Sequence, residues 1–313
     1  MKLFLGIDGG QSSTTALIGD EAGRVVGHGR SGPCNHVGAA EGRAKFLSAV
    51  GGSLRLALEQ VGVAEASFEG ACLGFSGGPA DKEALVDELL TAAHLIVTHD
   101  ARIALAGATA GEPGIIVIAG TGSIAFGRNA RMEMGRAGGW GYIFGDEGGG
   151  FDIARKALRA ILKHEEGWGG PTSLRDVFLK EAGARNANDL MHRFYTSEWP
   201  RPRIAALAKL VDEAAVAGDS VAHQVLHQAA LDLAEIAGAV RAKLFGPAEI
   251  AHIAPVGSVF RSAILQQHFK RQIDRNPANW FTQPKHGPAA GALLEAYQAA
   301  GLRVRLTGLP AEK

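Results

Sequence analysis

The chain has 313 residues, and Lys plus Arg equal Asp plus Glu at 32 each, so its formal net charge is zero. This balance gives no support to a nucleic-acid or anionic-membrane partner, because either would need an excess of basic residues. Apolar residues make up 46% of the chain. That is enough for two hydrophobic cores, and chains longer than about 250–300 residues usually divide into domains.

The cysteine content and the N-terminus indicate the compartment. Cys34 and Cys72 are the two cysteines, without Cys-x-x-Cys spacing. We therefore expect neither a disulfide framework nor a cysteine zinc site. Asp8 comes too early for a signal-peptide core, and no run approaches the roughly 20 apolar residues of a membrane helix. We expect a soluble, cytoplasmic protein.

The first feature in chain order is a glycine turn between two short apolar strands. Residues 3–7 and 15–18 have strand character, and the turn between them is Asp8-Gly-Gly-Gln-Ser-Ser-Thr14. Glycine lets a backbone approach a bound anion, while hydroxyls and free N–H groups donate to phosphate oxygens. Residues 24–28 resume a strand. The pattern predicts a three-stranded meander that carries a phosphate-binding turn.

The rest of the first half alternates helices and strands. We expect helices at 40–61, 81–93 and 101–108, and strands at 70–75 and 95–98. Gly111-Glu112-Pro113-Gly114 then interrupts the pattern. We place the domain boundary there, with domains at 1–113 and 114–313. A return of the last helix to the first domain remains open.

A second glycine turn starts the pattern again. Strand-like residues 115–119 and 124–127 flank Gly120-Thr121-Gly122-Ser123. Two such turns, roughly a hundred residues apart, indicate a duplicated architecture that holds one polyphosphate from both sides. Strands mixed with helical crossovers predict an α/β fold with a largely parallel sheet in each half. The second half is more helical, with helices expected at 151–165, 173–182, 187–195, 204–217 and 219–245, and a strand at 250–254.

Three acidic residues are candidates for the chemistry. Asp8 would repel a phosphate at the first turn unless a cation intervenes, and magnesium held through water resolves that conflict. Asp100 ends a strand and can accept the proton of an attacking hydroxyl, although a helix N-cap is its alternative interpretation. The glycine-rich segment 138–150 carries Asp146, which suits sugar hydroxyls as an acceptor or caps the following helix.

One motif points to another reaction class. Residues 74–78 match the G-x-S-x-G nucleophile elbow of α/β-hydrolases, with Ser76 between a strand and a helix and with His94 and His99 downstream. No His-Gly-Gly oxyanion segment precedes it, and a hydrolase leaves both glycine hairpins unexplained. A loop that lines a ligand crevice is the competing interpretation. Neither a Walker motif nor G-x-G-x-x-G after a strand occurs.

Taken in order, these segments resemble the N-acetylglucosamine kinase branch of the BadF/BadG/BcrA/BcrD ATPase family, within the actin/hexokinase/Hsp70 superfamily. The resemblance runs from about residue 3 to residue 300 and is carried by residues 6–14, 35–36, 76–78, 100–101, 119–123, 138–150 and 256–259. It implies two ribonuclease-H-like (actin-like ATPase) domains with an ATP and sugar cleft between them. The implied reaction is ATP-dependent phosphorylation of the 6-hydroxyl of N-acetylglucosamine, with glucosamine or N-acetylmuramic acid as alternatives. Relatives are commonly homodimers.

The resemblance also implies residue roles. It makes Asp8 the indirect magnesium holder and Asp100 the catalytic base. The residues implied at ATP are Gly10, Ser12, Ser13, Thr14, Gly120, Thr121, Gly122, Ala215, Gly257, Ser258 and Ser262. Those implied at the sugar are Asn35, Asp100, Ser123, Ile124, Gly139, Trp140, Gly141 and Asp146.

Two positions depart from the family pattern, and two other activities within the resemblance are disfavoured. Thr15 stands where many members carry Lys, so we expect no cation at the first turn, and Ile124 stands where some relatives have a polar residue. An activator of 2-hydroxyacyl-CoA dehydratases needs cysteine ligands for its cluster, and no cysteine follows Cys72. A sugar-responsive regulator is disfavoured because no helix-turn-helix segment precedes the first strand and Asp100 is retained.

Overall fold

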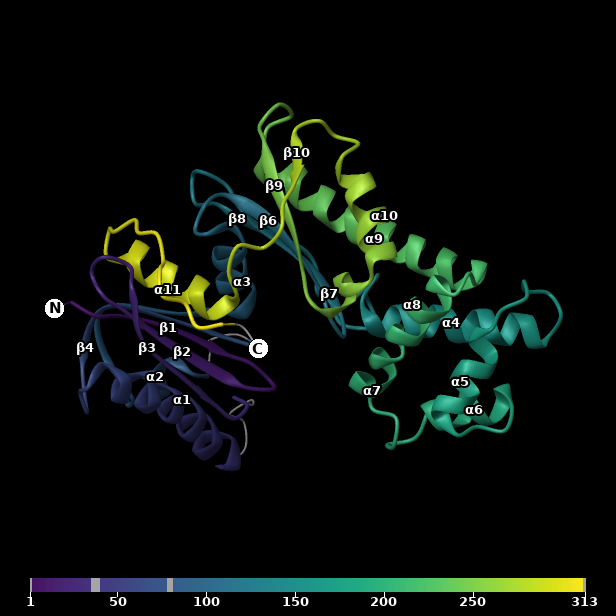
Figure 1. The fold of residues 1–313 in the computed structure, drawn as a ribbon, viewed down its shortest axis with the longest axis horizontal. Coiled ribbons are helices and arrows are strands. Elements are labelled where there is room, and N and C mark those ends of the chain that lie inside the picture. Colours follow the sequence, from purple (N-terminus) through teal and green to yellow (C-terminus); the bar gives the residue numbers. More distant parts are fainter. Residues whose placement is uncertain (1, 35–39, 78–80, 312–313) are drawn as a thin grey trace. The chain divides into compact units, whose positions relative to one another are not determined.

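The computed structural model describes residues 2–34, 40–77 and 81–311, and the chain forms two compact units (Figure 1). Unit 1 contains residues 1–112 and 284–313, and unit 2 contains residues 113–283. The chain therefore passes between the units twice. The C-terminal segment with helix α11 (Pro288–Ala299) belongs to unit 1.

Unit 1 is built on a five-stranded mixed sheet of order β3-β2-β1-β4-β5. The first three strands form the antiparallel meander, and β4 and β5 run parallel to β1. The strands are β1 (Phe4–Gly9), β2 (Thr14–Gly19), β3 (Val25–Ser31), β4 (Ser67–Phe75) and β5 (Thr91–His99).

Unit 2 repeats this topology in its own five-stranded sheet, of order β10-β9-β6-β7-β8. Strands β6, β7 and β8 form an antiparallel meander, and β9 and β10 are parallel to β6. The strands are β6 (Gly114–Ala119), β7 (Ser123–Arg128), β8 (Met134–Gly138), β9 (Ala251–Val256) and β10 (Asn279–Phe281). Each unit therefore has the ribonuclease-H-like sheet that the resemblance implies, and each glycine turn joins the first two strands of its sheet. The expectation of a largely parallel sheet is wrong, because the meander contributes two antiparallel pairs beside the two parallel pairs of each sheet.

Helices cover both faces of the unit 1 sheet. Successive strand residues point to opposite faces, and both faces of β1 are buried. Leu5 and Ile7 belong to the core cluster under α1 (Ala40–Val61). Phe4 points the other way and stacks on Tyr297 of α11, with 4.2 Å between ring centroids. The helices of this unit are α1, α2 (Glu83–Asp87), α3 (Asp100–Thr109) and α11.

Unit 2 buries one large core beneath a helical layer. Helix α9 lies along the meander, where Val240 packs close to Gly127 and Leu244 close to Gly135. The helices of this unit are α4 (Gly150–Glu165), α5 (Leu174–Ala182), α6 (Ala187–Phe194), α7 (Arg201–Ala206), α8 (Ala208–Val216), α9 (Ser220–Leu244), the 3₁₀ helix η1 (Ser258–Arg261) and α10 (Ala263–Ile273).

Two predicted helices differ from the structure. The helix expected at 81–93 is wrong beyond Asp87, because Thr91 and Ala92 pair with β4 in the parallel register of the sheet. Pairing with a neighbouring strand overrides the helix propensity of the alanines. The helix expected at 204–217 is divided at Leu207, where the backbone makes i to i+3 bonds. Strands β8 and β10 were not predicted, since both are short and lack a clear apolar alternation.

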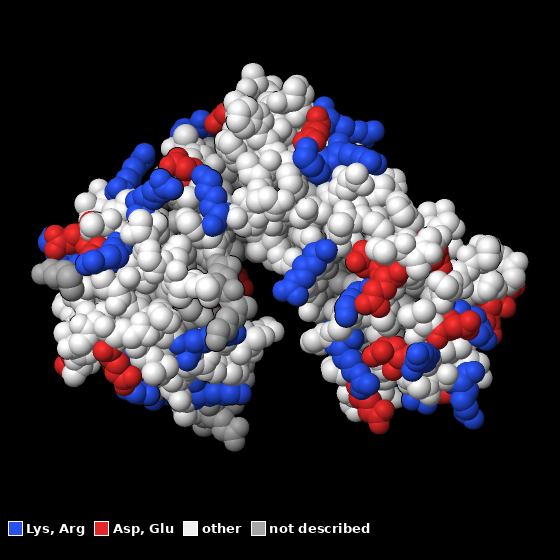
Figure 2. Space-filling view, in the orientation of Figure 1, with Lys and Arg blue, Asp and Glu red and all other residues white. Residues whose placement is uncertain are grey.

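The distribution of charged side chains and the state of the two cysteines are as the equal numbers of acidic and basic residues and the cysteine spacing predict. Figure 2 shows acidic and basic side chains mixed over the visible surface of both units. Cys34 and Cys72 are both buried and free. No helix within the described residues is both long enough and apolar enough to span a bilayer.

Candidate functional site

The first glycine turn of unit 1 is closed by its own backbone. Gly10 N–H donates to the carbonyl of Ser13 at 3.0 Å, and the Gly10 carbonyl accepts from the Cys34 N–H at 2.9 Å. The buried Thr14 hydroxyl donates to the Gly32 carbonyl at 3.0 Å. Ser12 stays exposed. Hydrogen bonds therefore fix the inner side of the turn, and the Ser12 side of the turn is accessible to solvent.

Asp8, Ser76 and Asp100 lie together at one edge of the same sheet. Strands β1, β4 and β5 are parallel neighbours, so their carboxyl ends meet there. Ser76 Oγ donates to Asp100 Oδ2 at 2.9 Å, and the Ala101 N–H donates to Asp100 Oδ1 at 2.8 Å. Asp100 is the first residue of α3, and its hydrogen bond with the Ala101 N–H stabilises the N-terminus of this helix. The two hydrogen bonds together fix the orientation of the Asp100 carboxylate.

Two carboxylates, those of Asp8 and Asp100, lie near each other at this edge. Burial, together with the neighbouring carboxylate of Asp100, raises the pKa of Asp8 to about 6. A divalent cation would favour the ionised form of Asp8. No group of three or more His, Cys, Asp or Glu side chains within the described ranges could hold a metal ion directly. This donor set suits magnesium, which commonly takes one or two carboxylates and otherwise uses water and substrate phosphates.

Arg30 places a positive charge beside the first glycine turn, which the sequence analysis did not predict. Thr15 offers no charge, but the β2–β3 register places Arg30 directly opposite Thr15. Directly opposed residues point to the same face of a sheet, and Arg30 Nη2 donates to Ser13 Oγ at 3.3 Å. The expectation that no cation stands beside this turn is therefore wrong. The pairing register of β2 and β3 would have identified Arg30 as the cation beside this turn.

The second glycine turn, in unit 2, is held by the segment that leads into α4. Gly150 N–H donates to the Gly120 carbonyl at 2.8 Å, and Phe151 N–H donates to the Thr121 carbonyl at 3.1 Å. Ser123 Oγ donates to the Glu147 carbonyl at 2.6 Å. The predicted phosphate turn and the predicted sugar segment are therefore in direct backbone contact.

Asp146 is the centre of this contact. Its backbone has φ of 65°, and its carboxylate is buried against Gly122, where a Cβ would lie 2.4 Å from Asp146 Oδ2. Ser123 N–H donates to Asp146 Oδ1 at 3.4 Å, and Arg201 Nη2 donates to Asp146 Oδ2. A side chain at position 122 would displace the Asp146 carboxylate and the Arg201 guanidinium from these positions.

The other predicted sugar residues divide into two groups. Gly139 N–H donates to the Ser123 carbonyl at 3.0 Å, and the Ile124 side chain packs against Gly139, so these residues adjoin Asp146. Trp140 is 65% exposed and lies against Arg136, with 4.9 Å from its ring centroid to the guanidinium carbon. Gly141 has open space beside its Cα. Asn35 lies outside the described residues.

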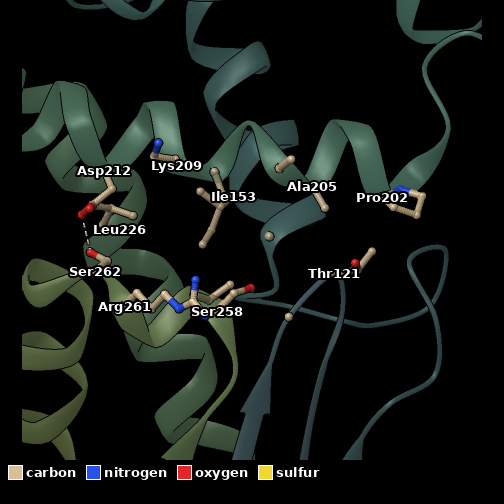
Figure 3. A pocket seen from close by; sticks show the side chains of 15 residues that line it. Thr121, Ile153, Pro202, Ala205, Lys209, Asp212, Leu226, Ser258, Arg261 and Ser262 are labelled. Carbon is tan, nitrogen blue, oxygen red and sulfur yellow. Dashed lines mark hydrogen bonds between the residues drawn. The ribbon is translucent and has the colours of Figure 1, made fainter. Parts of the chain in front are cut away.

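A cavity of about 490 Å³ opens on the second glycine turn (Figure 3). Its size suits a small ligand. Helices α4, α7, α8 and α9 form one side, and η1 with the start of α10 forms the other. Residues along it include Gly120, Thr121, Ile153, Ala205, Leu226, Ser258 and Ser262. The cavity thus combines a backbone cradle at the turn with largely apolar walls, the combination that a nucleotide requires.

The predicted adenosine residues are only partly at this cavity. Ser258 and Ser262 line it. Ser262 Oγ caps α10 by accepting from Leu265 N–H at 3.1 Å and donates to Asp212. Gly257 has φ of 104°, and a Cβ there would lie 2.4 Å from the Ala119 carbonyl, so it fixes the entry to η1. Ala215 does not line the cavity and is instead buried in the helical core. Asp212, which lines it, was not predicted.

The nucleophile elbow does not form a triad. Ser76 donates directly to Asp100, and both His94 and His99 are exposed. Among the described residues no histidine accepts a hydrogen bond from Ser76. A serine nucleophile needs an adjacent base that takes its proton, with that base oriented by a third group. The hydrolase alternative therefore loses its structural basis.

Comparisons with known proteins agree with this geometry over nearly the whole chain. The model of the BadF/BadG/BcrA/BcrD ATPase family matches residues 5–296. The N-acetylmuramic acid/N-acetylglucosamine kinase of Clostridium acetobutylicum is 33% identical over 306 residues, covering 95% of this chain and 98% of the relative. The N-acetyl-D-glucosamine kinase of Dictyostelium discoideum is 30% identical over 315 residues, covering 94% of this chain and 98% of the relative.

A solved structure shares the fold. A chain from Chromobacterium violaceum, assigned as an N-acetylglucosamine kinase, superposes with a TM-score of 0.73 at 27% identity. The match covers 94% of this chain and 98% of that chain. Both units of the present fold are therefore included in the similarity.

Proposed function

The chain belongs to the BadF/BadG/BcrA/BcrD ATPase family, and we propose that it is an ATP-dependent kinase that phosphorylates the 6-hydroxyl of an amino sugar, N-acetylglucosamine first. The observation that carries the proposal is the cavity that opens on the glycine turn of unit 2. Apolar walls suit a nucleoside, and the N–H groups of a glycine turn suit its phosphates. The kinases among its relatives support the class of acceptor.

Asp100 is proposed as the base. Its carboxylate is oriented by Ser76 and by the N–H of Ala101. As the sugar O6 forms its bond to the γ-phosphorus of ATP, the bond from that phosphorus to the bridging oxygen breaks, and ADP leaves with the electron pair. The hydroxyl proton passes to Asp100. Ser76 keeps one carboxylate oxygen in place during this transfer.

Magnesium is proposed as the companion of ATP, with Asp8 as its protein partner through water. The raised pKa of Asp8 supports this assignment, because burial beside Asp100 makes the ionised carboxylate costly unless a cation is present. When bound, the metal would neutralise phosphate charge. The remaining positive charge at the first turn comes from Arg30, which contacts Ser13.

Acceptor recognition is assigned to the segment around Asp146. Ser123, Ile124, Gly139 and Asp146 adjoin one another in unit 2. Carboxylate and carbonyl oxygens accept hydrogen bonds from sugar hydroxyls. Glucosamine and N-acetylmuramic acid remain alternative acceptors, and the Clostridium relative is named for both N-acetylmuramic acid and N-acetylglucosamine.

The deciding experiment measures ATP consumption with magnesium in parallel on N-acetylglucosamine, glucosamine, glucose and N-acetylmuramic acid. A clear preference for one amino sugar, with turnover reduced at least 1,000-fold in Asp100→Asn while sugar binding persists, is the expected result. Near-normal turnover in Asp100→Asn would remove this residue as the base. Absence of sugar-stimulated turnover with every acceptor would reject the kinase assignment.

The proposal also includes a homodimer, which the family resemblance implies, and a cytoplasmic location, which the cysteine content indicates. Size-exclusion chromatography with light scattering measures the mass directly. The chain weighs 32.6 kDa, so a particle of one chain mass would contradict the dimer.

A further inference from the structure

Arg201 forms an ion pair at the point where the predicted phosphate turn and the predicted sugar segment meet. It begins α7, and its Nη2 donates to Asp146 Oδ2. The same Nη2 lies 2.8 Å from the position that a Cβ on Gly122 would occupy. The guanidinium therefore contacts the carboxylate and occupies the space beside Gly122 that a side chain at this position would need.

Aromatic rings hold this guanidinium in place. Its central carbon lies 5.1 Å from the ring centroid of Tyr142 and 6.0 Å from that of Phe151. Cations over aromatic faces are attracted by the ring quadrupole. The Nε of Arg201 is buried and has no acceptor among the described residues. Asp146 is thus the polar anchor of this side chain, and the rings direct the guanidinium toward it.

The need for this cation follows from charge. Asp146 has a side chain only 8% exposed, and its Oδ2 lies 2.4 Å from where a Gly122 Cβ would be. An unpaired carboxylate there would repel any phosphate group bound to the turn, and because this carboxylate is buried, solvent would screen its charge only weakly. It also accepts the Ser123 N–H, a donor that a phosphate would otherwise use. A charge partner is required before the same turn can accept a polyphosphate.

We propose that Arg201 is a positioning residue of the kinase reaction, which cancels the charge of Asp146 beside the Gly122 turn so that this turn can accept the phosphates of ATP. The inference rests on the proposed function. It makes a distinct prediction, because loss of Arg201 leaves the sugar-binding carboxylate present and impairs ATP binding. A merely structural ion pair would impair both substrates alike.

The test compares Arg201→Gln, Asp146→Asn and the double variant in initial-rate kinetics, with each substrate varied in turn. In Arg201→Gln the KM for ATP should rise at least tenfold. In Asp146→Asn the KM for the sugar should rise at least tenfold, with the KM for ATP within threefold of wild type. In the double variant the KM for ATP should return to within threefold of wild type, while the KM for the sugar stays high.

The matched control is Arg203→Gln on the same helix. Arg203 stacks on Trp199 at 4.0 Å and does not contact Asp146, so both KM values should stay within twofold of wild type. An unchanged KM for ATP in Arg201→Gln, or a double variant no better than Arg201→Gln, would overturn the proposal. Thermal unfolding of each variant identifies those that fail to fold.

Equilibrium dialysis with Mg·ATP in the absence of sugar separates this inference from the proposed function. The Kd for ATP should rise at least tenfold in Arg201→Gln and recover in the double variant. This readout does not depend on turnover. ATP binding that follows this pattern without any amino-sugar kinase activity would support Arg201 and reject the acceptor. Equal ATP binding in wild type and Arg201→Gln would reject Arg201, even in an active kinase.

Discussion

Replacing Asp8 with asparagine should stabilise the ligand-free protein at neutral pH while abolishing sugar-dependent ATP turnover. Burial first, and then the nearby carboxylate of Asp100, raise the pKa of Asp8 from 3.8 to about 6. The folded state therefore prefers protonated Asp8. The tighter binding of this proton in the folded state adds to the free energy of unfolding. This contribution is fully present below pH 3.8 and is lost as the pH rises through about 6. Asparagine is neutral at every pH and avoids this loss.

The size of the effect follows from the pKa difference. At 1.36 kcal/mol for each pH unit, the difference corresponds to about 3 kcal/mol in the free energy of unfolding at pH 7.5. The gain of Asp8→Asn over wild type should be near zero at pH 4 and should grow through pH 6. Mg·ATP should then stabilise wild type more than the variant, because the cation favours the ionised carboxylate.

The assay must report on unit 1. Trp140, Trp168, Trp199 and Trp280 all lie in unit 2, so their fluorescence serves as an internal reference. Hydrogen exchange of β1 peptides in urea, followed from pH 4.5 to 8, measures the stability of unit 1. A variant no more stable than wild type at pH 7.5, or a gain independent of pH, would refute the reasoning.

Asp20 in unit 1 provides a control, because its pKa is shifted in the opposite direction to that of Asp8. Asp20 is buried, which acts to raise its pKa, but the N–H groups of Arg24 and Ala22 and the Arg24 side chain lower its pKa overall. The folded state therefore prefers ionised Asp20, and that stability is present above pH 3.8 and lost as the pH falls below it. Asp20→Asn should destabilise unit 1 at pH 7.5. Stabilisation by both asparagine variants would indicate a general charge effect instead.

Three further predictions concern the two glycine turns and the base. Ser76→Ala should lower kcat about 10-fold without changing the KM for the sugar, since it removes one bond to Asp100; loss of an esterase activity on a simple acyl substrate would instead revive the hydrolase. Arg30→Gln should raise the KM for ATP about 10-fold, and adding Thr15→Lys should restore it, because the two positions are directly opposed; no rescue in steady-state kinetics would argue against a charge role. Gly122→Ala should lower the free energy of unfolding by about 1–3 kcal/mol through overpacking against Asp146. Gly120→Ala has open space for its Cβ and should melt at the wild-type temperature, so equal melting of the two variants would contradict the packing.

Local sequence signals were sufficient to predict the duplicated hairpins and most helices. Apolar runs broken by glycine and hydroxyl residues are local signals, and both glycine turns join adjacent antiparallel strands as predicted. Helix α1 spans the predicted residues 40–61. Asp8 and Asp100 were recognisable because each follows or ends a strand, and the carboxyl ends of parallel strands meet at one sheet edge.

Which charged side chains come together depends on strand register and long-range packing. Arg30 reaches Ser13 only because of the β2–β3 register. Arg201 reaches Asp146 across 55 residues of sequence, and no local pattern encodes that distance. The start of β5 at Thr91 likewise depends on its pairing with β4. Register and long-range packing are set by the whole fold. Local propensity therefore predicted the glycine turns, whereas the fold determined which charged side chains lie beside them.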